Sequence, residues 1–153
     1  MSCAVSWMGR LAVVAVIGGC APSAVDGPPT IRYGETACAQ CRMLISEDRF
    51  AAAAKTHDGE LQTFDGIGCL LRYAAEHPGA VERSWVHDYE SARWLDAQDA
   101  FVVRSQELTT PMGDGVIAVS TQEQADRLAQ ALHGRSQRLT ELFQSSRDQG
   151  RGS

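Results

Sequence analysis

Residues 50–79 read FAAAAKTHDGELQTFDGIGCLLRYAAEHPG, and this stretch decides the fold. The Asp58-Gly59 pair is typical of a tight turn between antiparallel strands. Residues 61–64 alternate in polarity after that turn and predict the returning strand. The four alanines at 51–54 predict a tightly packed strand before it. The stretch therefore begins as a β-hairpin.

A helix is expected directly after the hairpin. Asp65 stands where an N-cap residue belongs, and His77-Pro78-Gly79 is a stop signal. Apolar residues recur between them with helical spacing, at Ile67, Leu70, Leu71 and Ala74. Cys69 lies about 200° from Ile67 on a helical wheel. It therefore either faces another element or serves as a small buried hydrophobe.

A second strand-strand-helix pattern follows in outline. Strands are expected at 84–88, 100–103 and 116–119, with residues 94–96 leading into the second of them. Thr121 and Gln124 have the spacing of a capping box, and the helix after them has its apolar stripe at Ala125, Leu128, Ala129 and Leu132. One short helix is expected at 139–143. The pattern predicts an α+β body of two ββα units, with an internal repeat as a suggestion.

Residues 36–43, TACAQCRM, bring three sulfur atoms into six residues. Cys38 and Cys41 have the C-x-x-C spacing of a redox pair or a metal site. Thiolate and thioether ligands together favour Cu(I) over hard ions, so Met43 favours half of a copper site. The alternatives are a structural disulfide between Cys38 and Cys41, with Met43 as an ordinary core residue.

Met112 is the second methionine of interest. It lies between Pro111 and Gly113 in a loop that joins two expected strands. A loop is a place from which a ligand can be presented and withdrawn. The alternative is a methionine that folds back as a hydrophobic plug.

The first residues have the features of an export signal. Arg10 precedes an apolar run at 11–17 that is too short to span a bilayer, and Gly18-Gly19 leads into Cys20. This series resembles the bacterial lipoprotein box, which implies cleavage before Cys20 and its acylation. We expect a signal peptide at 1–19, a Pro-rich tether at 20–32, a body at 33–144 and a disordered tail at 145–153.

Composition narrows the classes of function. The 153 residues fit one domain, and the net charge of −5 comes without a basic patch, so nucleic acid is not an expected partner. Three cysteines remain if Cys3 is removed with the signal peptide and Cys20 is acylated. An odd number cannot all pair in disulfides. No hydrolase, zinc-protease or phosphate-loop motif is present.

Six segments in register resemble the NosL type of nitrous-oxide reductase accessory lipoprotein. They are Cys38-x-x-Cys41-x-Met43, Asp58-Gly59, residues 64–73, residues 85–89, residues 94–97 and Thr110-Pro111-Met112-Gly113-x-Gly115. Arg42 stands where the family often has glycine. The resemblance implies two ββα units akin to the core domain of organomercurial lyase.

The resemblance also implies a site and a role. Cys41 would supply a thiolate to Cu(I), Met43 and Met112 thioethers, and Cys38 a further thiolate or a regulatory partner of Cys41. The implied role is a copper chaperone without catalytic turnover. It would be anchored through Cys20 on the periplasmic side of the bacterial envelope. Ala21, the residue after Cys20, resembles the signal that sorts lipoproteins to the outer membrane. It would serve nitrous-oxide reductase and its membrane maturation machinery.

Other hypotheses stay open at this point. The main rival is a thiol-disulfide oxidoreductase that uses Cys38 and Cys41, and cleavage of a carbon–mercury bond rests on analogy of fold alone. Zn(II) and Hg(II) are thiophilic as well. His87 and Asp88 form a hydrogen-bonded pair next to the metal ligands, supply a fourth ligand, or are a surface pair.

Overall fold

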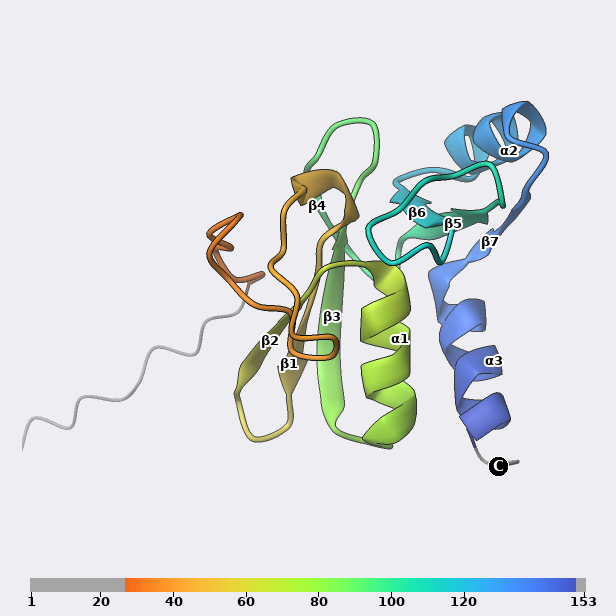
Figure 1. Ribbon diagram of the computed structural model, residues 1–153. Coiled ribbons are helices and arrows are strands. Elements are labelled where there is room, and N and C mark those ends of the chain that lie inside the picture. The colour runs from red at the N-terminus through yellow and green to blue at the C-terminus, as the bar shows by residue number, and fades with distance from the viewer. Residues whose placement is uncertain (1–26, 151–153) are drawn as a thin grey trace, which may run out of the picture.

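The computed structural model describes residues 27–150 and contains two antiparallel sheets flanked by helices (Figure 1). The larger sheet has the order β2-β1-β3-β4, with β1 at Ala52–Thr56, β2 at Leu61–Phe64, β3 at Val81–His87 and β4 at Trp94–Asp96. The smaller has the order β6-β5-β7, with β5 at Phe101–Arg104, β6 at Val116–Val119 and β7 at Arg135–Arg138. The helices are α1 (Ile67–Glu76), α2 (Gln122–Ala131) and α3 (Leu139–Gly150), and the 3-10 turn η1 (Asp48–Phe50) precedes β1. The expected α+β class is confirmed.

The two sheets are built by the same chain path. In each unit two strands form a hairpin, a helix follows, and a third strand returns to pair with the first. Ala52 of β1 thus lies opposite Val86 of β3, and Phe101 of β5 lies opposite Arg138 of β7. Each expected ββα unit therefore gains a strand after its helix, and the suggested repeat exists at the level of topology.

The core forms where the alanine strand meets α1. Ala51 to Ala54 are all fully buried, and their small side chains let neighbouring segments pack closely. The predicted stripe of α1 is buried in the same cluster, which also takes in Leu142 and Phe143 of α3. Figure 1 shows α1 between the larger sheet and α3. The apolar periodicity of residues 67–74 was thus a sound guide to packing.

Several elements differ from the sequence prediction. β3 begins at Val81 rather than at 84, and β7 was not predicted because Arg-Ser-Gln-Arg carries no apolar signal. α3 continues to Gly150, through most of the segment expected to be disordered. Ile31, expected in the tether, is buried in the core. Among the described residues, no helix has the length and apolar character needed to cross a membrane.

A buried carboxylate joins the two units. Asp88, just after β3, is only 2% exposed. One of its oxygens accepts hydrogen bonds from the Glu90 amide and from the amide and hydroxyl of Ser91. The other accepts from the Ser120 amide of the second unit at 2.9 Å. Burial alone would raise the pKa of Asp88, but the bonds from Ser91, Ser120 and Glu90 outweigh it, so this pKa lies below its usual value.

We predict that Asp88→Asn lowers the free energy of unfolding by about 2–4 kcal/mol, because hydrogen bonds to a charged group contribute ~1.5–3 kcal/mol each. An amide keeps one acceptor oxygen and turns its NH2 group toward a donor. Since the folded pKa is lowered, the carboxylate stabilises the protein above its unfolded pKa of about 4, and this stabilisation is lost as pH falls through the folded pKa.

Urea denaturation of wild type and variant should therefore show a deficit at pH 7 that shrinks toward pH 3. Asp99→Asn is the control, because Asp99 is exposed. An equal deficit at both pH values would contradict the assignment.

Candidate metal centre

Three cysteines from two segments meet at one point. The sulfur atoms of Cys38, Cys41 and Cys69 all lie within 4.8 Å of one another. All three are free thiols, so the structure contains no disulfide between Cys38 and Cys41. Cys38 and Cys69 are fully buried and Cys41 is partly exposed. Three soft donors at this spacing suit a thiophilic ion, with Cys41 on the open side.

The loop that carries Cys38 and Cys41 is a tight hairpin. The Cys38 amide donates to the Met43 carbonyl at 2.8 Å, and the Arg42 amide donates to the Cys38 carbonyl at 3.0 Å. Ala39 fixes the loop to β2 by donating to the Thr63 carbonyl at 2.8 Å. Arg42 has φ 67°, the left-handed conformation that glycine adopts without strain. The loop thus keeps a shape typical of glycine at a position that holds arginine.

Cys69 reaches the site from the first turn of α1. Both alternatives left open for Cys69 hold, and the first holds because its sulfur lies beside two thiols of the hairpin loop. It is also part of the buried core. Sequence reasoning left it out of the ligand set, although its position off the apolar stripe was the signal that could have included it.

The buried pair favours one thiolate before any metal arrives. The pKa of Cys38 is lowered by a hydrogen bond from the Cys69 thiol, against the opposing effect of burial, and further by the amides of Cys41, Asp65 and Gln40. The pKa of Cys69 is raised because it shares its proton with Cys38 and because it is buried. Arg72 partly offsets this by donating to the Cys69 sulfur at 3.4 Å. The lowered pKa of Cys38 and the raised pKa of Cys69 favour a thiolate at Cys38, where backbone amides donate to the sulfur.

Asp65 is not the N-cap that the sequence predicted. Gly66 holds that position and α1 has no side-chain cap from it, while Asp65 is 2% exposed. Oδ1 of Asp65 has no hydrogen-bond partner among the described residues. Burial and the charge of Cys38 raise the pKa of Asp65, and a hydrogen bond from Ser46 opposes them. The backbone amide of Asp65 instead donates a hydrogen bond to the Cys38 sulfur.

The two methionines lie in different surroundings. Met43 is 55% exposed, beside Leu44 at 54%. Met112 is half-buried and packs against the core cluster that contains Cys38 and Cys69. Their roles as thioether ligands stay predictions, as do those of Cys38 and Cys41, and Cys20 lies outside the described residues.

His87 and Asp88 are not a surface pair, because both are buried. They bond to different groups. Nδ1 of His87 donates to the Ala92 carbonyl at 3.0 Å, and Nε2 accepts from the Tyr33 hydroxyl at 3.4 Å. Burial lowers the pKa of His87, partly offset by the Ala92 bond and by Asp48. Among the described residues the two side chains do not hydrogen-bond to each other, and neither belongs to the group of possible metal ligands formed by the three thiols.

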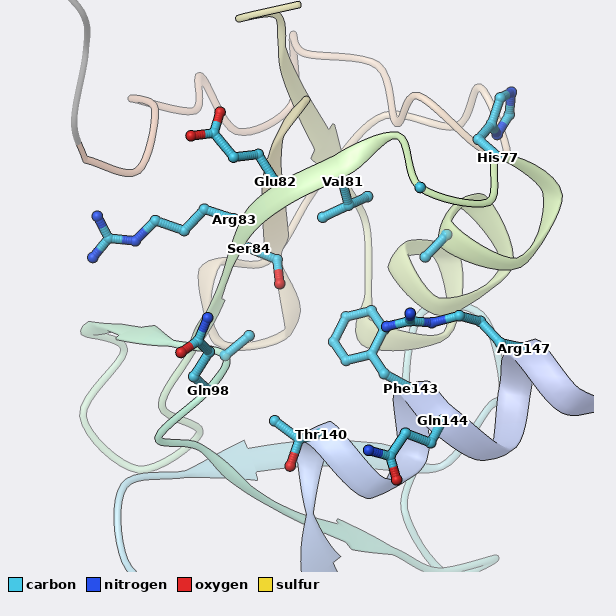
Figure 2. A pocket seen from close by; sticks show the side chains of 13 residues that line it. His77, Val81, Glu82, Arg83, Ser84, Gln98, Thr140, Phe143, Gln144 and Arg147 are labelled. Atoms are coloured by element: carbon cyan, nitrogen blue, oxygen red, sulfur yellow. The ribbon is translucent and has the colours of Figure 1, made fainter. Parts of the chain in front are cut away.

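A cavity of about 440 Å³ lies away from the thiols. Figure 2 shows β3 on one wall, with Val81 and Ser84, and α3 on the other, with Phe143 and Arg147. None of its lining residues is a cysteine or a methionine. This cavity has no part in the sulfur site.

Fold and site together define a small α+β protein of two ββαβ units with a buried cluster of three thiols. The chain belongs to the NosL family, whose model matches residues 30–146. Among solved structures it is similar to the copper chaperone NosL from Shewanella denitrificans, with a TM-score of 0.68 and 20% identity over 75% of this chain and 94% of that one. At that identity the likeness shows the fold alone. No curated protein sequence matches significantly.

The suggested likeness to organomercurial lyase stays a prediction.

We predict that Asp65→Asn stabilises the protein near neutral pH. A carboxyl whose folded pKa is raised stabilises fully only below its unfolded pKa of about 4, and that contribution is lost as pH rises through the folded pKa. The amide of asparagine carries no charge at any of these pH values, so its contribution to stability does not fall as pH rises. Metal-free protein unfolded by urea at pH 4.5, 6 and 7.5 should show a gain that grows with pH, opposite in slope to Asp88→Asn. A loss that grows with pH would show that the Asp65 charge is favourable.

Proposed function

We propose that this protein is a Cu(I) metallochaperone that delivers copper for the maturation of nitrous-oxide reductase. The observation that carries the proposal is the cluster of three free thiols within 4.8 Å in a member of the NosL family. Soft thiolate and thioether donors favour Cu(I). We assign Cys41, Cys38 and Cys69 as thiolate ligands or reserve thiolates, and Met43 and Met112 as thioether ligands.

The gradient of burial suits transfer rather than storage. The inner thiols are fully buried and Cys41 is partly exposed. Among the described residues, Met43 is the most exposed large hydrophobic side chain. A recipient can therefore replace the outer ligands first while the inner ones still hold the ion. A closed four-thiolate site would oppose such exchange.

Large apolar side chains are exposed at Met43 itself, at Leu44 beside it and at Tyr33, whose neighbour Gly34 donates to the Ile45 carbonyl at 2.8 Å. Tyr33, Met43 and Leu44 are 38%, 55% and 54% exposed. Exposed apolar side chains close together in sequence and beside a binding site support a docking surface for a protein partner. We propose that the partner is nitrous-oxide reductase or its membrane maturation machinery. The protein would meet it on the periplasmic side of the envelope, held at the outer membrane by acylated Cys20.

The oxidoreductase alternative lacks comparable support. A redox C-x-x-C pair opens a helix with one sulfur exposed to substrate. Here the pair lies in a hairpin loop, and the thiol that hydrogen-bonds the buried Cys38 sulfur is that of Cys69, while Cys41 contributes its backbone amide.

The binding prediction is tested with reduced protein and a chromogenic Cu(I) chelator under anaerobic conditions. We expect one Cu(I) per chain. Cys41→Ala should weaken affinity by about 100-fold or more, as loss of one strong ligand of several kcal/mol implies. Met43→Ala and Met112→Ala should each weaken it by about tenfold without a change in unfolding free energy beyond ~1–2 kcal/mol.

The outcomes separate the alternatives. X-ray absorption should show sulfur neighbours only. Tighter binding of Zn(II) than of Cu(I), or nitrogen and oxygen atoms as the neighbours of the bound metal, would contradict the copper assignment. Affinity unchanged by either methionine variant would remove the thioethers from the site.

The physiological prediction uses a strain without the gene, complemented with wild type or Cys20→Ala. Without the gene, nitrous-oxide reductase should be made and exported but short of copper at its catalytic centre. The Cys20→Ala protein should leave the membrane fraction and restore the metal poorly at limiting copper, because an acyl anchor keeps the donor near its partner. Fully metallated reductase in the deletion strain would contradict the proposal, and a general failure of periplasmic disulfide formation would favour the oxidoreductase.

A further inference from the structure

The loop that carries Met112 is attached to α1 by one carboxylate. Oδ2 of Asp114 accepts a hydrogen bond from the Gly68 amide at 2.9 Å. Oδ1 of Asp114 accepts from the Thr110 hydroxyl at 2.7 Å and from the Val116 amide at 3.2 Å. One oxygen therefore holds the loop in shape while the other binds the first turn of α1. Figure 1 shows this loop, between β5 and β6, over the N-terminal end of α1.

Any side chain at position 68 would displace the carboxylate of Asp114. A Cβ added at Gly68 would lie 2.1 Å from Oδ2 of Asp114 and 2.9 Å from its Cγ. The backbone of α1 is thus bare at the point where the carboxylate approaches. Two features far apart in sequence, a helical glycine and a loop aspartate, fit each other.

Charge favours the same contact. The first amides of a helix lack intrahelical partners and lie at the positive end of the helix dipole, so a carboxylate is stabilised there. Asp65, the local acid expected to serve this end, makes no such bond. Gly68 and Asp114 line a groove of about 830 Å³ together with Arg72 and Arg104. Their contact therefore lies beside open space and not inside the sealed core.

We propose that Asp114 is a positioning residue for copper: by binding the Gly68 amide, it holds the Met112 loop of the second unit against the turn of α1 that presents Cys69. Gly68 is the immediate neighbour of Cys69, and Asp114 is two residues from Met112. The bond thus sets the position of the thioether relative to the thiol cluster. This inference rests on the proposed function, in which Met112 is a copper ligand.

Two variants break the contact from opposite sides. Gly68→Ala fills the space of the carboxylate without changing any residue of the loop, and it replaces glycine by a better helix former, so it does not weaken α1 by propensity. Asp114→Asn keeps the size of the side chain. Because both oxygens of Asp114 are acceptors, an amide must turn its NH2 group toward the donors on one side.

Gly66→Ala is the matched control. It adds the same methyl group two residues earlier, where the nearest atom is Oδ2 of Asp114 at an ordinary 3.6 Å. Gly66 has φ −172°, an extended conformation open to any residue. It should leave the contact and copper binding unchanged.

The decisive measurement is a double-mutant cycle on Cu(I) affinity. We expect Met112→Ala to weaken binding about tenfold in the wild type and in Gly66→Ala, but less than about twofold in Gly68→Ala and Asp114→Asn, a coupling of about 1 kcal/mol. Loss of stability alone would leave the effect of Met112→Ala intact. A tenfold effect in all four backgrounds overturns the proposal.

A metal-free measurement tests the contact by itself. The Gly68 amide has no intrahelical acceptor, so its protection from hydrogen exchange depends on Asp114. We expect exchange at Gly68 to be at least about tenfold faster in Asp114→Asn than in wild type or Gly66→Ala. Unchanged exchange overturns the contact. If exchange responds but Met112→Ala has no effect in the wild type, the methionine assignment of the proposed function fails instead, and with it the role of Asp114 toward copper.

Discussion

The hydrogen bond from the Ser120 amide to the Asp88 carboxylate is the interaction on which the arrangement of the two units depends. Tyr89 beside it donates to the Ala118 carbonyl at 2.8 Å, so side chain and backbone fasten the end of β3 to the end of β6. A buried carboxylate is costly unless its acceptors are satisfied, and both oxygens of Asp88 are. The thiols all belong to the first unit and Met112 to the second. Any site that uses both depends on this attachment together with the contact between Asp114 and Gly68.

The thiol cluster is prepared electrostatically before a metal enters it. Amides of Gln40, Cys41 and Asp65 surround the sulfur of Cys38, and the Cys69 thiol adds another donor. Backbone amides held by a tight hairpin do not reorganise when charge appears, so the cost of burying the thiolate is met by the fold. Binding of a cation then requires fewer protons to be displaced than three ordinary thiols would demand.

Local signals in the sequence predicted local structure well. The hairpin at Asp58-Gly59, the stripe of α1 and the capping box of Thr121 and Gln124 are all present, because each depends on residues within one turn or one strand pair. β7 escaped prediction because its strand character comes from pairing with β5 rather than from its own polar residues. Cys69 escaped for a related reason. Its neighbours in space lie about thirty residues earlier in the chain, and no local period reports them.

The misassignment of Asp65 has a physical explanation in the same site. If Asp65, directly before the helix, capped α1 as a carboxylate, its charge would lie beside the Cys38 thiolate, and two adjacent anions disfavour each other. The structure separates the two tasks. Asp65 is buried with a raised pKa and gives its backbone amide to the thiolate, while Asp114 brings the stabilising carboxylate to the helix from the other unit. A local cap would have stabilised α1 alone, whereas a cap supplied by the second unit ties the stability of that helix end to the position of the loop that carries Met112.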